Sequence, residues 1–175
     1  MWGNGKKQKN ESKKDQIIQE KVQNINKPLN ELKVDDSLEN NIKLIKTLFQ
    51  DVDILRSKNI ANIENPSLKY CIFYSDGMVA NPIINDYIIK PLTLTSSLSQ
   101  SRELLDELLE KVLQVNEMSK TDDVKKIVQS IANGDTVLFC EGQDQALVLN
   151  TKGYSIRSIA EPDNEKNLSG PREGF

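Results

Sequence analysis

Any enzymatic chemistry in this chain has to rest on carboxylates, lysine or tyrosine, because its 175 residues contain no histidine. That absence excludes Ser-His-Asp and Cys-His catalysis and histidine-based zinc sites. Cys71 and Cys140 are too few for an all-cysteine zinc site, which needs four thiolates. Each lies in an apolar run, so we expect two reduced, buried thiols rather than a disulfide. The sequence therefore predicts no catalytic, metal-binding or cofactor-binding residues.

Acidic residues occur in pairs, but their positions indicate structural roles. Asp35-Asp36 and Asp122-Asp123 stand at predicted helix starts, where carboxylates interact favourably with the helix dipole. Asp51 and Asp53 flank the start of a predicted strand with Arg56 just beyond, and we expect an ion pair or a turn cap there. No phosphate cradle is expected either, because neither a GxGxxG nor a Walker-type glycine motif occurs.

Polar side chains at strand ends are the remaining candidates for binding a small ligand. Tyr74 and Asp76 stand at the end of one predicted strand, and Arg157 stands near the end of another. Ligand sites are often concave and lie at domain junctions. If the chain binds a small molecule, we expect these three residues to line a cleft between two subdomains.

The first of these subdomains is predicted over residues 36–95. Its elements are a helix from Asp36 to Gln50 with Asp36 and Glu39 as a capping box, strands over 53–56 and 69–74, and a helix that begins at Asn81-Pro82 and is closed by Pro91. The strand over 69–74 is β-prone on both faces, so it is expected to be central in a sheet.

The second subdomain is predicted over residues 96–160, after a Ser/Thr-rich connector. It begins with a long helix over 101–117, followed by a helix capped by Thr121 and stopped at Asn133-Gly134, and by strands over 136–140, 146–149 and 154–159. The fold class is therefore α/β (α+β), with two small mixed helix–sheet subdomains packed together. Residues 1–35 are expected to form a basic tail that is disordered or partly helical.

Charge and hydropathy limit the partners and the location. The net charge is −3, which gives no reason to expect a nucleic acid as partner. No apolar run approaches the roughly 18–20 residues that span a bilayer, and the start lacks the apolar core of a signal peptide. A cytoplasmic location is the default expectation for this segment.

The final stretch, from Ser169 to Phe175, is unusual for the end of a domain. Pro171 fixes its own φ, Gly174 is conformationally permissive, and the neighbouring Arg172 and Glu173 cannot share a helical face. We therefore expect residues 161–175 to form an extended, charged junction that docks on another element and leads into a further part of a longer protein.

Several separated segments match a known family. They are DVDILR over 51–56, YSDGMV over 74–79, IIKPL over 88–92, GDTVLF over 134–139 and R-x-I-x-E-P-x-x-E-x-x-x-x-G-P-R-E-G-F over 157–175. With them the chain resembles, over about residues 36–175, the amino-terminal cytoplasmic domain of the A subunit of nutrient germinant receptors from spore-forming bacteria. Ser75 and Met78 depart mildly from the family pattern.

The resemblance implies a non-enzymatic component of a receptor that responds to amino acids, sugars or nucleosides and triggers ion release and spore germination. It implies a B subunit and a lipoprotein C subunit as partners. The implied location is the cytoplasmic, spore-core side of the inner membrane, with multi-pass membrane spans after the final motif. The residues expected to contact other subunits are Arg157, Glu161, Gly170, Pro171, Arg172, Glu173 and Phe175. A module that binds the nutrient itself is the alternative.

Overall fold

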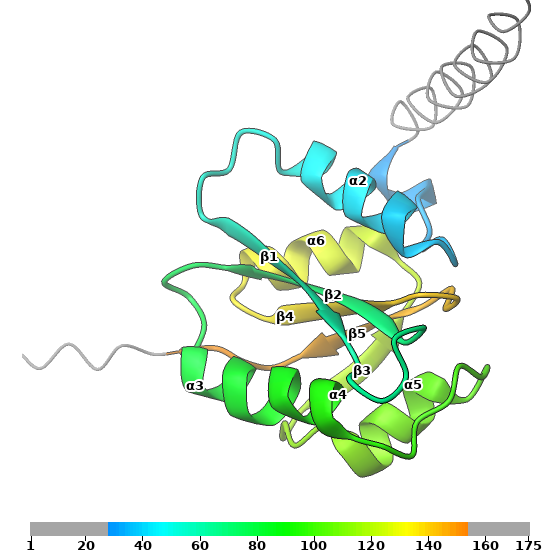
Figure 1. The fold of residues 1–175 in the computed structure, drawn as a ribbon. Coiled ribbons are helices and arrows are strands. Elements are labelled where there is room, and N and C mark those ends of the chain that lie inside the picture. Colours follow the sequence, from blue (N-terminus) through cyan, green and yellow to red (C-terminus); the bar gives the residue numbers. More distant parts are fainter. Residues whose placement is uncertain (1–27, 154–175) are drawn as a thin grey trace, which may run out of the picture.

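The computed structural model describes residues 28–153, which form an antiparallel sheet covered by helices on both faces (Figure 1). The sheet has five strands in the order β1-β2-β4-β5-β3. The strands are β1 (Leu55–Ala61), β2 (Lys69–Ser75), β3 (Met118–Thr121), β4 (Thr136–Cys140) and β5 (Ala146–Leu149). Every neighbouring pair is antiparallel. The α/β class expected from the sequence is confirmed.

The helices form one layer on each side of the sheet, above and below it in Figure 1. Helices α2 (Leu38–Leu48) and α6 (Val124–Ala132) cover one face. The other face carries α3 (Asn81–Ile84), the π-helical η3 (Asn85–Ile89), α4 (Lys90–Leu94), α5 (Leu104–Glu107) and the π-helical η4 (Leu108–Val112). A short 3-10 helix, η2 (Leu29–Glu31), precedes α2. None of the helices within 28–153 combines the length and hydrophobicity needed to cross a membrane.

Strand β2 contributes side chains to both hydrophobic clusters, because successive side chains of a strand point to opposite faces of the sheet. Cys71 and Phe73 lie in the hydrophobic cluster beneath α2 and α6, which we call the α2–α6 cluster. Tyr70 and Ile72 lie in the cluster against α3, α4 and α5, which we call the α3–α5 cluster. The Phe73 ring meets Phe139 edge-on, with ring centroids 6.0 Å apart. The expected central strand is confirmed.

The sheet crosses the boundary that the sequence analysis placed at the Ser/Thr-rich connector. Strand β2 from the first half pairs with β4 from the second, in the register Tyr70↔Cys140 to Phe73↔Val137. All five residues of β4 are buried, so this strand needs a neighbour on each edge and a helix layer on each face. Within the described residues, which end at 153, the two predicted subdomains, 36–95 and 96–160, therefore contribute to one sheet.

The two thiols face opposite layers. Cys71 belongs to the α2–α6 cluster and Cys140 to the α3–α5 cluster, so the sheet itself separates them. Both are free and buried, as expected. Burial raises the pKa of the Cys71 thiol to about 12 and also raises the pKa of Cys140. At neutral pH both therefore remain protonated and weakly nucleophilic.

Two helix starts differ from the predictions by one or two residues. The first helix is capped by Ser37, whose Oγ accepts from the Asn40 amide at 3.4 Å, and not by Asp36 with Glu39. The Asp36 residue instead contacts the β4–β5 turn, where its backbone carbonyl accepts from the Gly142 amide at 2.8 Å. Likewise Asp123, not Thr121, caps α6, because Thr121 belongs to β3.

Two helix ends were predicted wrongly. Pro91 does not close its helix, which continues to Leu94. A proline removes an amide donor, and the carbonyl four residues earlier, that of Tyr87, accepts from Gln114 at 3.4 Å. The predicted long helix over 101–117 ends at Val112, since Leu113 has an extended backbone and the chain then pairs with β5 as β3. Strand β1 also begins later and runs further than the predicted 53–56.

Candidate functional site

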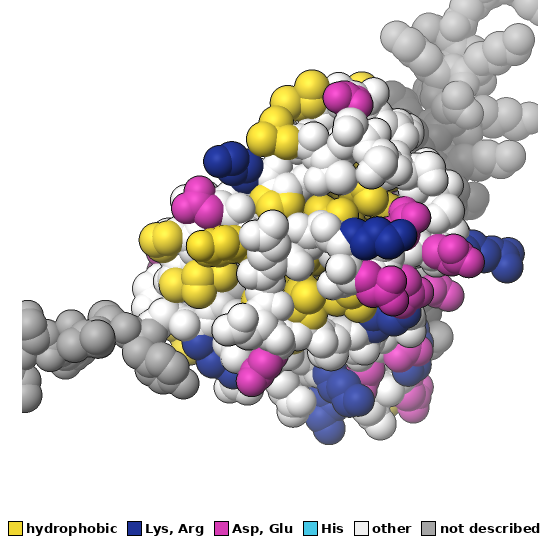
Figure 2. All heavy atoms as spheres, turned by 90° about the horizontal axis from the view of Figure 1, so that it is seen from below, with side chains coloured by type: hydrophobic (Ala, Val, Ile, Leu, Met, Phe, Trp, Pro, Cys, Tyr) yellow, Lys and Arg dark blue, Asp and Glu magenta, His cyan; other side chains and the backbone are white. Residues whose placement is uncertain are grey.

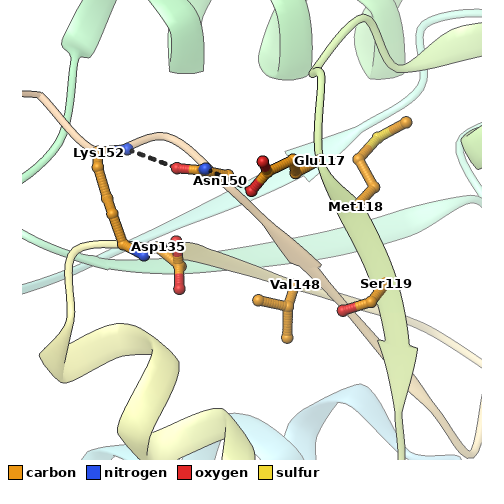
Figure 3. Close-up of a pocket in the computed structure, with 7 residues that line it drawn as sticks. All are labelled: Glu117, Met118, Ser119, Asp135, Val148, Asn150 and Lys152. Carbon is orange, nitrogen blue, oxygen red and sulfur yellow. Dashed lines mark hydrogen bonds and ion pairs between the residues drawn. The ribbon is translucent and has the colours of Figure 1, made fainter.

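A surface hollow of about 310 Å³ lies where β3, β5 and the end of α6 meet (Figure 3). Its lining combines carboxylate, ammonium, amide, hydroxyl and apolar groups. The lining residues are Glu117, Met118, Ser119, Asp135, Val148, Asn150 and Lys152.

Strand geometry explains why these side chains converge. Val148, Asn150 and Lys152 are spaced by two along the chain, so their side chains share one face. Ser119 pairs with Val148 across β3 and β5, and the Asn150 amide donates to the Glu117 carbonyl at 3.0 Å. Val148 packs against the α2–α6 cluster. The hollow therefore opens on the face that α6 covers.

The end of α6 supplies the remaining wall. Helix α6 stops at Asn133, and Gly134 follows with φ +88°, which confirms the predicted Asn-Gly helix stop. This turn places Asp135 at the entrance of β4. The Asp135 side chain is only 12% exposed, and its carboxylate lies 3.3 Å from Lys152 Nζ. The ion pair thus joins the end of α6 to the chain beyond β5.

A second polar contact organises the opposite side of the hollow. Asn150 Nδ2 donates to Glu117 Oε2 at 2.8 Å, and Asn150 Oδ1 accepts from the Lys152 amide at 3.4 Å (Figure 3). The lining holds two carboxylates and one ammonium. This balance favours a small polar ligand that carries a positive or neutral group over an anion, with Val148 as the apolar floor.

The groups elsewhere in the fold are poorly suited to catalysis. The buried thiols are protonated at neutral pH, and the Tyr70 hydroxyl is buried with no hydrogen-bond partner among residues 28–153, which raises its pKa. Over the same residues, no three acidic or cysteine side chains are grouped to hold a metal ion.

Two of the three ligand residues predicted from the sequence, Tyr74 and Asp76, lie elsewhere, and the third, Arg157, is outside the described residues. Tyr74 is half-buried on β2 and packs against the α3–α5 cluster. Asp76 follows β2 and forms an ion pair with Arg56 at 3.2 Å, and Arg56 also donates to the Asp53 carbonyl at 2.6 Å. Neither Tyr74 nor Asp76 lines the hollow. The expected ion pair near Arg56 exists, but its acidic partner is Asp76.

The residues predicted to contact other subunits lie outside residues 28–153. They are Arg157, Glu161, Gly170, Pro171, Arg172, Glu173 and Phe175. No sequence motif predicted Glu117, Asp135, Asn150 or Lys152 as site residues. Asn150 and Lys152 alternate in polar character after β5, and this pattern was their one sequence signal. Glu117 was predicted to lie in a helix over 101–117, so nothing in the sequence placed it beside Asn150.

The ion pair in the hollow should contribute measurably to stability. We expect Lys152→Met to lower the free energy of unfolding by about 1–2 kcal/mol, because it leaves the largely buried Asp135 carboxylate unpaired. Adding Asp135→Asn should recover part of that loss. Urea unfolding of the chain measures both variants.

The matched control is Lys43→Met. Lys43 lies 2.6 Å from Glu39, but both side chains are largely exposed, so its removal should cost less than about 0.5 kcal/mol. If Lys152→Met cost no more than this control, the pair at the hollow would have no special structural role.

Comparison with known proteins gives a family and a fold. The model of a family described as Bacillus/Clostridium GerA spore germination protein matches residues 40–175. The chain is 30% identical over 112 residues to spore germination protein KA of Bacillus subtilis, covering 64% of this chain and 20% of that protein. It is also 30% identical over 160 residues to the B. subtilis membrane protein YfkQ, covering 91% of this chain and 29% of that protein.

A solved structure has the same fold. It is the amino-terminal domain of the A subunit of the Bacillus megaterium spore germinant receptor GerK3, with a TM-score of 0.61 and 24% identity over 70% of this chain and 49% of that one. The chain thus spans about half of the solved domain and less than a third of these two curated relatives.

Proposed function

The chain belongs to the Bacillus/Clostridium GerA family of spore germination proteins, and from this premise we propose that it is the amino-terminal domain of a germinant receptor A subunit. In that role it takes part in nutrient sensing and passes on the signal that triggers germination, without catalysis of its own. The observation that carries the proposal is the extent of the family match, which takes in both the described domain and the tail over 157–175.

The proposed setting is a receptor in the spore inner membrane. The domain lies on the cytoplasmic, spore-core side, membrane spans follow it in the full-length protein, and a B subunit and a lipoprotein C subunit are its partners. Support comes from the names of the similar proteins, one a membrane protein and another a receptor A subunit.

The tail motif offers the sharpest test of this role. We expect the charge swap Arg172→Glu with Glu173→Arg, made in the full-length receptor in spores, to slow nutrient-triggered germination about tenfold, which corresponds to a loss of about 1.4 kcal/mol in a contact with another subunit. Nutrient-triggered and receptor-independent germination are followed together in the same spores.

An internal control is available in the same chain. Arg102 and Glu103 form a second adjacent Arg-Glu pair and both are exposed, so swapping their charges should leave germination unchanged. Germination at the normal rate in the Arg172/Glu173 swap, with the protein present at its usual level, would contradict the proposed contact.

The hollow favours a second candidate function, the binding of a small polar ligand by this domain. Its mixed lining around Val148 is the observation that supports it. NMR titration of the chain with amino acids, sugars and nucleosides at millimolar concentration should then shift the amides of Ser119, Val148 and Asn150, and Lys152→Met should weaken the response. Amides that do not move at these concentrations would rule out this second function and leave the first in place.

A further inference from the structure

Exposed apolar side chains gather at the end of the domain where the described chain stops. Figure 2 shows apolar side chains on the side from which the grey trace after residue 153 leaves, with most charged side chains on the other side. Val52, Ile54 and Met78, which we call the exit patch, are 40%, 45% and 37% exposed.

Backbone hydrogen bonds shape the two turns that carry these three residues and join one turn to the other. The Leu55 amide donates to the Val52 carbonyl at 3.2 Å, and the Asp76 amide donates to the Ile54 carbonyl at 2.8 Å. The Met78 amide then donates to the Ser75 carbonyl at 3.2 Å. The patch is therefore a fixed part of the sheet end, built from the turns before β1 and after β2.

The chain beyond β5 is anchored to the same place. The Gly153 amide donates to the Met78 carbonyl at 2.9 Å, and the Ala80 amide donates to the Thr151 carbonyl at 2.8 Å. A Cβ atom on Gly153 would lie 2.7 Å from the Ala80 nitrogen and the Val79 carbonyl carbon, so only glycine fits this close approach. Gly153, the last described residue, therefore lies beside Met78 of the exit patch.

The chemistry of the next residues complements the patch. Tyr154, Ile156 and Ile159 are apolar, and Arg157 is the only charged residue of 154–160. The exit patch is bordered by the exposed carboxylates of Asp51, Asp53 and Asp76 and by Arg56, which pairs with Asp76. Lys152 also lies beside Met78, but it pairs with the carboxylate of Asp135. The rim of the exit patch is therefore net negative, opposite in sign to Arg157.

The length of the segment after Gly153 and the small area of the exit patch both favour docking of this segment. Three extended residues span about 10 Å, enough to bring Ile156 over the side chains that surround Met78. A patch of three partly exposed side chains cannot supply the roughly 800 Å² that each partner of a stable protein–protein interface buries. A tethered segment needs far less, because the tether gives it a high effective concentration.

We propose that the exit patch is the docking site of residues 154–159 of the same chain. Tyr154, Ile156 and Ile159 pack on Val52, Ile54 and Met78, and Arg157 faces the acidic rim. This contact sets the direction in which the chain leaves the domain toward the tail motif.

Cysteine cross-linking in the intact 175-residue chain tests the proposal. The paired substitution Met78→Cys with Ile156→Cys should form an intramolecular disulfide under mild oxidation, and the two native thiols do not interfere because they are buried and protonated. The control pair is Leu94→Cys with Ile156→Cys. Leu94 is 55% exposed, but the helix from Asn81 to Leu94 carries it about 20 Å from the exit, beyond the reach of Ile156.

We expect the Met78 pair to cross-link about tenfold faster than the Leu94 pair, because docking raises the effective concentration of residue 156 near residue 78. Adding Arg157→Glu should slow the Met78 pair, since it places a negative charge against the acidic rim. Equal rates for the two pairs would overturn the proposal, as would a disulfide that forms only between chains, which would assign the patch to a second copy.

Discussion

The pairing of β2 with β4 is the interaction on which the rest of this structure depends. It joins the two halves of the chain at the centre of the sheet, and every residue of β4 is buried. Because β2 alternates between the two hydrophobic clusters, the same strand supports α2 and α6 on one face and α3, α4 and α5 on the other. The long sequence separation of Tyr70 from Cys140 means that the chain must close a large loop before this pairing forms. The hollow and the exit patch lie at the margins of this sheet and take their shape from it.

Much of the fold could be predicted from local patterns, and the failures have physical causes. Strands β2, β4 and β5 and helices α2 and α6 have clear β-prone runs or helical periodicity and caps, so their positions were close to the predictions. Strand β3 was missed because three of its four residues, MSKT, are polar, and they form a strand only through pairing with β5. In the region of η3 and η4 the buried residues recur every four positions, as in Ile84, Ile88 and Leu92. In an α-helix, side chains four residues apart differ in direction by about 40° around the axis. A π-helical turn reduces this difference and keeps such residues on one face. The sequence prediction assumed regular α-helix and did not include π-helical turns.

The tail motif over 157–175 could be predicted from the sequence, whereas the hollow could not. The tail over 157–175 is a local motif, so it could be recognised from the sequence, and the family match extends over it. The hollow depends on Glu117, Asp135 and Lys152, which three separate segments bring together, and no local pattern links them. Tyr74 and Asp76 were chosen as strand-end residues, yet the fold uses one for packing and the other for an ion pair with Arg56. Lys152 borders the hollow while its neighbour Gly153 is anchored at the exit patch. A ligand in the hollow would therefore lie one residue from Gly153, the last residue that the structure describes.

Because β2 and β4 pair at the centre of the sheet, we expect the described residues before and after the Ser/Thr-rich connector to unfold as one unit. The two native thiols test it directly, because Cys71 lies on β2 in the first half and Cys140 on β4 in the second, on opposite faces of the sheet. The rate at which a thiol reagent labels each one under native conditions gives the free energy of the opening that exposes it. The account predicts equal opening free energies for Cys71 and Cys140, both equal to the free energy of global unfolding. A Cys140 that becomes labelled by a separate opening of lower free energy, while Cys71 remains protected, would contradict it.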